Sequence, residues 1–122
     1  MKSDWILIAN GTHARLLQQK GDAPPVIVQG FTHAEGRARV GGPVDDRELH
    51  RFAHELAESL ERHAQLGNFN SLAIFAAGPF LAELRAELGP ATLRPLTGTH
   101  EVDLTSVGPA ELQRRMAYEL AH

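Results

Sequence analysis

The sequence predicts an α/β fold in which helices cover both faces of a mixed five-stranded sheet. Residues 5–9 are a continuous apolar run, and 71–77 is apolar after Ser71, as expected of strands that are covered on both faces. Three strand patterns come first, with no helical pattern between them. Helical and strand patterns then alternate to the end of the chain, which is typical of parallel pairing through crossover helices. The 122 residues fit one domain over 1–122.

The first three strands are expected to form an antiparallel meander. The Asn10-Gly11 pair follows the strand at 5–9, and it is the strongest short hairpin signal because a type I′ turn needs positive φ at both central positions. Residues 13–19 form a half-polar second strand, which we expect to be partly exposed. Residues 26–32 form a third strand, and Gly30 with its polar neighbours places this strand at the sheet edge.

A long helix is expected to begin after Asp45, which can cap it together with Glu48 in a capping-box-like pair. Gly67 is expected at the C′ position, where a left-handed backbone is common. Apolar residues recur between them at helical spacing, namely at Leu49, Phe52, Ala53, Leu56, Leu60 and Ala64.

The remaining chain predicts a strand at 71–77, a short helix at 80–88 that Gly89-Pro90 stops, and a strand within 93–102. Pro109 suits the first turn of a final helix. Strands that are reached through helices pair in parallel with right-handed crossovers. With the two most apolar strands at the centre, the element order βββαβαβα gives strand order 3-2-1-4-5. This is the ribonuclease H-like arrangement.

Composition excludes several classes of protein. Apolar residues make up 43% of the chain and the net charge is −3, so disorder is not expected. Without cysteine the chain has no disulfide framework, no thiolate nucleophile and no Cys-based zinc site. Asp4 interrupts the start before any long apolar run, so we expect no signal peptide. No run is long enough to span a membrane, and we expect a cytoplasmic protein.

Catalytic motifs are missing from the sequence. It has no Gly-x-Ser-x-Gly, Walker loop or Gly-x-Gly-x-x-Gly, and we expect neither a cofactor nor a conventional catalytic set. Nucleases of this fold typically hold two metal ions with an Asp on the first strand, a Glu on the first helix and an Asp near the fourth strand. Here the first strand ends in Asn10 and the fourth runs into Ala76-Ala77, so a two-metal nuclease is not expected.

The segment 33–44 is the longest irregular stretch and the leading candidate for a binding site. It carries Arg37 and Arg39, which suit phosphate, and Gly41-Gly42, which allow a close backbone approach. Of twelve basic residues only Lys2 and Lys20 are lysines, and arginine is the better residue for bidentate contacts. The net negative charge disfavours general nucleic-acid binding, so any binding of nucleic acid would need a local patch of basic residues. The alternative is a surface loop whose glycines merely allow the turn into the helix.

Asp46, His50 and His54 are four residues apart in turn and therefore project along one side of the long helix. Two histidines four apart can share a metal, and an added carboxylate completes a three-ligand open site. The alternative is a solvated polar stripe beside the apolar face.

Four segments, 5–17, 52–60, 67–85 and 102–105, resemble the bacterial host-attachment protein family. The Pro79-Phe-Leu-Ala-Glu-Leu-Arg85 run is their most specific piece. That family resembles the middle domain of archaeal and eukaryotic class I translation release factors, where a Gly-Gly-Gln tripeptide before the long helix enters the peptidyl-transferase centre. Here the corresponding tripeptide is Gly41-Gly42-Pro43. Pro43 has neither a side-chain amide nor a backbone N–H to orient water.

The resemblance therefore implies a non-catalytic or degenerate module that binds the ribosome, structured RNA or a ribonucleoprotein surface. Its contact residues are expected to be Arg37, Arg39, Gly41 and Gly42. The first alternative is a protein-interaction or homo-oligomerising module that pairs through the edge of the third strand. The second is a metal-dependent hydrolase that uses Asp46, His50 and His54.

Overall fold

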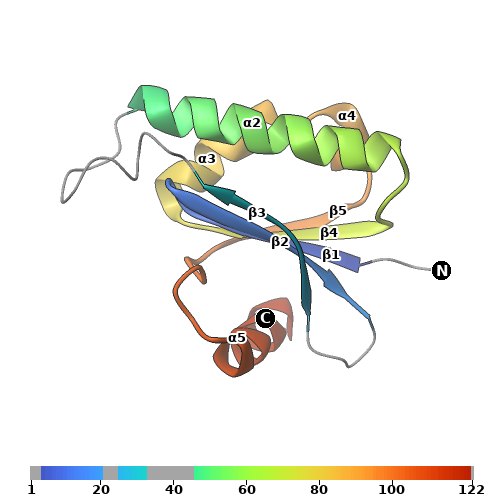
Figure 1. Cartoon of the computed structure of the whole chain (residues 1–122), viewed down its shortest axis with the longest axis vertical. Helices are drawn as coiled ribbons and strands as arrows, with labels where there is room; N and C mark the ends of the chain where they lie inside the picture. Colours follow the sequence, from blue (N-terminus) through green and yellow to red (C-terminus); the bar gives the residue numbers. More distant parts are fainter. Residues whose placement is uncertain (1–3, 21–24, 33–45, 122) are drawn as a thin grey trace.

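A computed structural model describes residues 4–20, 25–32 and 46–121 of the chain. Figure 1 shows a sheet with helices α2, α3 and α4 above it and helix α5 below it. The elements are β1 (Asp4–Ala9), β2 (His13–Gln19), β3 (Val26–Thr32), α2 (Asp46–Gln65), β4 (Ser71–Ala76), α3 (Gly78–Glu87), α4 (Pro90–Leu93), β5 (Leu96–Glu101) and α5 (Pro109–Ala121).

The strand order is β3-β2-β1-β4-β5. β2 pairs antiparallel with both β1 and β3, whereas β4 pairs parallel with both β1 and β5. The predicted ribonuclease H-like order, with a meander followed by two crossovers, is confirmed. It follows from the apolar character of β1 and β4, since central strands are covered on both faces.

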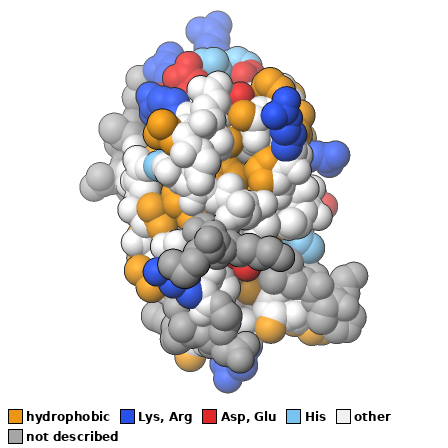
Figure 2. All heavy atoms as spheres, turned by 90° about the vertical axis from the view of Figure 1, so that its right-hand side faces the viewer, with side chains coloured by type: hydrophobic (Ala, Val, Ile, Leu, Met, Phe, Trp, Pro, Cys, Tyr) orange, Lys and Arg blue, Asp and Glu red, His pale blue; other side chains and the backbone are white. Residues whose placement is uncertain are grey.

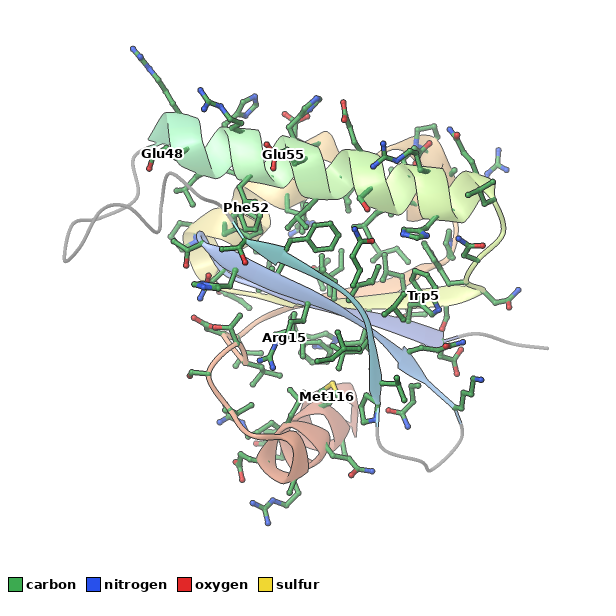
Figure 3. All side chains as sticks on the ribbon, viewed as in Figure 1. Trp5, Arg15, Glu48, Phe52, Glu55 and Met116 are labelled. Atoms are coloured by element: carbon green, nitrogen blue, oxygen red, sulfur yellow. The ribbon has the colours of Figure 1, made fainter. Side chains whose placement is uncertain are left out.

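The side chains of β1 alternate between two cores, one on each face of the sheet. Trp5, Leu7 and Ala9 pack beneath α2 and α3, whereas Ile6 and Ile8 pack against α5. In Figure 3, Phe52 points from α2 toward the sheet and Met116 lies on α5 at the opposite face. The largest side chains with less than 2% exposure are Phe52, Phe75, Phe80, Leu7, Ile8, Leu16, Leu56, Leu60, Leu72, Ile74, Leu84 and Leu104.

The turn between β1 and β2 differs from the prediction. Among the described residues only Gly67 has positive φ, at 71°, so a type I′ turn at Asn10-Gly11 is wrong. The side chain of Asn10 makes the turn instead. Its Oδ1 accepts hydrogen bonds from the backbone N–H groups of Thr12 and His13, both at 2.9 Å. Asparagine competes in this way with backbone-only turns.

The end of α2 agrees with the prediction from the sequence, whereas the region after α3 differs from it. Gly67 has the left-handed backbone expected just beyond α2. The predicted cap at Asp45 lies outside the described residues. Gly89-Pro90 follows α3 as expected, but Pro90 also begins the short helix α4, which the sequence analysis missed.

Glu61 of α2 explains the position of α4. Its carboxylate accepts hydrogen bonds from the N–H groups of Ala91 and Thr92, at 3.2 and 3.0 Å, and from Thr92 Oγ1 at 2.9 Å. Desolvation works to raise the pKa of Glu61, but these hydrogen bonds outweigh it and lower that pKa. A side chain from another helix thus caps α4.

β3 forms one edge of the sheet, as predicted. Val26, Ile27 and Val28 are 64%, 56% and 41% exposed. Leu16 and Leu17 pair with Gln29 and Ile27, so Val28 is the extra residue of a bulge. β3 therefore combines exposed apolar side chains with a bulge in its pairing with β2.

Candidate functional site

The four residues of the predicted binding segment, Arg37, Arg39, Gly41 and Gly42, lie outside the described residues. The described residues show which two elements the segment with these four residues connects. Thr32 ends β3 and Asp46 begins α2, so the segment joins the end of the edge strand to the start of the long helix. Two described surfaces flank these junctions: the first half of α2, and the face of the sheet near His13 and Thr32.

The first surface is a hollow of about 560 Å³ on α2, lined by Arg47, His50, Arg51 and His54. All four side chains are exposed. Figure 2, which faces the C-terminal end of α2, shows basic, acidic and histidine side chains at the top of the molecule. The surface beside the predicted binding segment is therefore polar and carries two guanidinium groups.

His50 and His54 face carboxylates of α3. His54 Nδ1 lies 3.1 Å from Glu87 Oε2, and its Nε2 lies 2.9 Å from Glu58 Oε1 on the next turn. His50 Nδ1 lies 3.4 Å from Glu83 Oε2, and its Nε2 lies 3.5 Å from Glu87 Oε1. The hydrogen bond to Glu87 and the charge of Glu58 raise the pKa of His54. The two histidines therefore join α2 to carboxylates of α3.

The metal hypothesis stays a prediction. The structure brings His50 and His54 to one side of α2, as their spacing indicated. The side chain of Asp46, their expected third ligand, lies outside the described part of the chain. Among the described residues, no group of three His, Asp or Glu side chains is arranged to hold a metal ion.

A chain of polar hydrogen bonds, here called the relay, lies at the carboxyl end of β1 and was not predicted from the sequence. Asn10 Nδ2 donates to Thr105 Oγ1 at 2.9 Å, and Thr105 Oγ1 donates to Asp103 Oδ1 at 2.6 Å. On the other side Thr12 Oγ1 donates to Asn10 Oδ1 at 3.1 Å, and His13 Nδ1 lies 2.8 Å from Thr12 Oγ1. These bonds join the β1–β2 turn to the loop before α5.

Asp103 is the ionised end of this relay. Partial burial works to raise the pKa of Asp103, but hydrogen bonds from the side chain and backbone of Thr105 and from Asn10 outweigh it and lower that pKa. The carboxylate therefore stays charged at neutral pH and orders the donors that point toward it.

The second surface is a hollow of about 470 Å³ beside the relay, on the face of the sheet that α5 covers further along. Arg15 reaches into this region, and its Nη2 donates to the backbone carbonyl of Thr105 at 2.6 Å. Figure 3 shows Arg15 below the sheet, on the side of α5. The polar and glycine residues that line the hollow are His13, Arg15, Gly30, Thr32, Thr105 and Ser106.

These features define an α/β protein of ribonuclease H-like topology with polar surfaces at both ends of the 33–45 connection. The chain belongs to the family described as proteins required for attachment to host cells, whose family model matches residues 39–116. The expected family is confirmed. A comparison with curated proteins gives no match.

Solved structures confirm the fold. Archaeal Pelota, in a model of the ribosome-bound protein with ABCE1, has a TM-score of 0.61 at 17% identity over 96% of this chain and 33% of that one. The archaeal translation termination factor aRF1 has a TM-score of 0.51 at 14% identity, over 98% and 39%. The Ppx/GppA phosphatase of Aquifex aeolicus has a TM-score of 0.52 at 14% identity, over 84% and 36%.

The chain spans between 33% and 39% of the length of these structures. Translation factors and a phosphatase share the topology, so the likeness shows a release-factor-like fold and leaves the activity to the residues. Within the described residues no helix has the length and apolarity to cross a lipid bilayer.

Proposed function

We propose that this chain is a cytoplasmic, release-factor-like module of one domain that binds structured RNA or a ribonucleoprotein surface such as the ribosome. The contacts are made by Arg37, Arg39, Gly41 and Gly42, extended by Arg47 and Arg51 on α2. The observation that carries the proposal is the hollow on the first half of α2, where both of these arginines stand beside His50 and His54.

Charge supports the proposal, because RNA affinity comes mainly from cations that meet phosphates. The chain is acidic overall, with a net charge of −3, so binding needs a concentrated patch. Arg37 and Arg39 precede α2 by few residues, and Arg47 and Arg51 follow on its first turns. The similarity to Pelota, which is described as bound to the ribosome, agrees with this assignment.

The proposed role is binding without peptide release. In release factors the Gly-Gly-Gln segment supplies an amide beside the reacting ester, and this chain has Pro43 at the third position. Proline lacks both the amide side chain and a backbone N–H. The paired glycines still allow close approach to a phosphate backbone.

Co-sedimentation of the full chain with ribosomes and with bulk RNA, from about 50 to about 500 mM salt, tests the proposal. Binding should weaken steeply with salt. Arg37→Glu with Arg39→Glu should abolish it, and Arg47→Glu with Arg51→Glu should weaken it. Arg114→Glu is the matched control, because Arg114 is exposed on α5, on the opposite face of the sheet. Absence of binding at the lowest salt, or equal losses in the control, contradicts the proposal.

The exposed edge of β3 favours a second candidate function, the binding of another protein or a second copy of this chain. Val26, Ile27 and Val28 are unusually exposed for large apolar residues, and β3 contains no charged residue. Native edge strands normally carry charges that discourage pairing. Such an edge can accept another strand through its backbone.

Light scattering over a range of protein concentrations tests the homo-oligomeric version. Ile27→Lys should shift an oligomer toward monomer because it puts a charge on the edge. Leu66→Lys is the matched control, since Leu66 is 75% exposed and lies in the turn after α2, outside the strand β3. A monomer at every concentration contradicts this candidate.

A further inference from the structure

We infer that the hollow over the β2–β3 ladder is a binding site for a phosphate group, held by Arg15 with His13 and nearby hydroxyl groups. The site is separate from the 33–44 segment, and the inference does not rest on the function proposed above. Its ligand is a small phosphate-bearing molecule, either inorganic phosphate or a phosphate monoester.

The register of the sheet places the polar groups on one face. Arg15 pairs with Ile8 of β1, which packs in the core on the α5 side, and partners across strands share a face. Successive residues of a strand alternate between faces, so His13 lies on the same face as Arg15. Their partners on β3 are Thr32 and Gly30, respectively.

Gly30 keeps the space in front of Arg15 open. A Cβ built at Gly30 meets no atom within 4 Å, so a side chain at this position would project into the hollow. The volume of about 470 Å³ lies within the range of small-molecule sites.

Arg15 is oriented before any ligand arrives. Its hydrogen bond to the carbonyl of Thr105 uses one of five guanidinium N–H donors. No carboxylate lies within ion-pair distance of Arg15 in the part of the chain that the structure describes. The described lining of the hollow contains no acidic residue. A positioned guanidinium that makes no ion pair with the described residues favours an anion, and its planar fork matches phosphate.

The relay fixes the ring of His13. His13 Nδ1 lies 2.8 Å from Thr12 Oγ1, and the hydrogen bond between these two atoms orients the imidazole ring. Nε2 then remains for the ligand. The hydrogen that it shares with a phosphate oxygen comes from a P–OH group or from a protonated imidazole. Hydroxyls of Thr32 and Ser106 line the same hollow and add donors.

Isothermal titration of the full chain with inorganic phosphate, 5′-AMP and sulfate, at constant ionic strength, tests the inference. Phosphate or 5′-AMP should bind saturably at one site, with sulfate several-fold weaker. Tighter binding of inorganic phosphate identifies the free anion as the ligand, and tighter binding of 5′-AMP identifies a monoester. Equal binding of sulfate and phosphate overturns the assignment to phosphate, as does failure of both phosphate compounds to bind.

Two variants locate the site. Arg15→Gln should weaken binding by at least about tenfold, because it removes charge-assisted hydrogen bonds. Gly30→Val should abolish binding by filling the hollow, and a β-branched residue suits a strand. Circular dichroism reports whether each variant folds. If Arg15→Gln does not fold, Gly30→Val alone tests the location of the site. Affinities equal to wild type in both folded variants overturn the inference.

Arg114→Gln is the matched control for loss of a positive charge and should leave the affinity unchanged. The Arg37→Glu, Arg39→Glu variant separates this inference from the proposed function. This variant should retain phosphate binding even if it no longer binds RNA. If the wild-type chain does not bind ribosomes at all, it should still bind phosphate. Loss of phosphate binding in either of these variants contradicts a site at Arg15.

Discussion

Asn10 should contribute to stability far beyond what a turn residue usually does. Its side chain makes four hydrogen bonds of 3.1 Å or less, with Thr12 N, Thr12 Oγ1, His13 N and Thr105 Oγ1. Each bond contributes about 0.5–1.5 kcal/mol net, and the low end applies where water replaces the partner. Asn10→Ala should therefore lower the free energy of unfolding by about 2–3 kcal/mol.

Urea unfolding monitored by circular dichroism measures this loss. With a slope of about 2 kcal/mol per molar, the midpoint should fall by about 1 M or slightly more. Thr105→Val removes the hydroxyl that joins Asn10 to Asp103 and should cost about 1–2 kcal/mol. The double variant should cost about 1 kcal/mol less than the sum, because both changes break the same bond.

Additivity of the two losses within about 0.3 kcal/mol would refute the relay as a coupled unit. Gln65→Ala provides the control for loss of an amide side chain. Gln65 is exposed and makes one long contact, 3.4 Å from Nε2 to Glu61 Oε2. Its replacement should change the free energy of unfolding by no more than about 0.5 kcal/mol.

Three further predictions concern the helical layer. The raised pKa of His54 stabilises the fold fully below the unfolded value of about 6.5, and this contribution is lost as pH rises through the folded pKa. His54→Gln should therefore lower the urea midpoint more at pH ~5.5 than at pH ~8.5, and equal shifts would contradict the ion pairs with α3. Gly89→Ala should lower the midpoint clearly, because its Cβ would lie 2.6 Å from the Glu61 carboxylate that caps α4. The matched Gly30→Ala change should not lower it. Phe52→Ala should cost about 3–5 kcal/mol, since Phe52 is 1% exposed and packs 5.4 Å from the ring of Phe80, whereas Leu66→Ala should be nearly neutral.

The sheet could be predicted because its strongest signals are local. Apolar runs marked β1 and β4 as central strands, and Gly30 in a polar context marked β3 as an edge. The same local logic failed at Asn10-Gly11, where a type I′ turn was expected. The turn uses the Asn10 side chain, which is also tied to Thr105, 95 residues away. A contact between residues so far apart cannot be predicted from the sequence pattern around either of them.

Contacts between residues far apart in the sequence also limited the prediction of the candidate sites. The spacing of His50 and His54 correctly placed them on one side of α2. Their partners on α3, Glu83 and Glu87, each stand 33 residues further along and could not be read from that spacing. Helix α4 was missed because its cap comes from Glu61 on α2. The hollow at Arg15 had a readable signal: His13 and Arg15 alternate with apolar residues, so the polar face of β2 was visible. The pairing of Arg15 with Gly30, which has no side chain to cover this face, is seen only in the structure.

The parallel pairing of β1 with β4 has a consequence for synthesis of the chain. Asp4 pairs with Ser71, and these residues are 67 positions apart. While the chain emerges from its N-terminus, β1 can pair with β2 early, but its other edge has no strand until residues 71–76 appear. Long-range strand pairing is slow and leaves apolar edges open to aggregation. One edge of β1, whose residues from Trp5 to Ala9 are all buried in the folded protein, therefore stays unpaired until β4 has been synthesised.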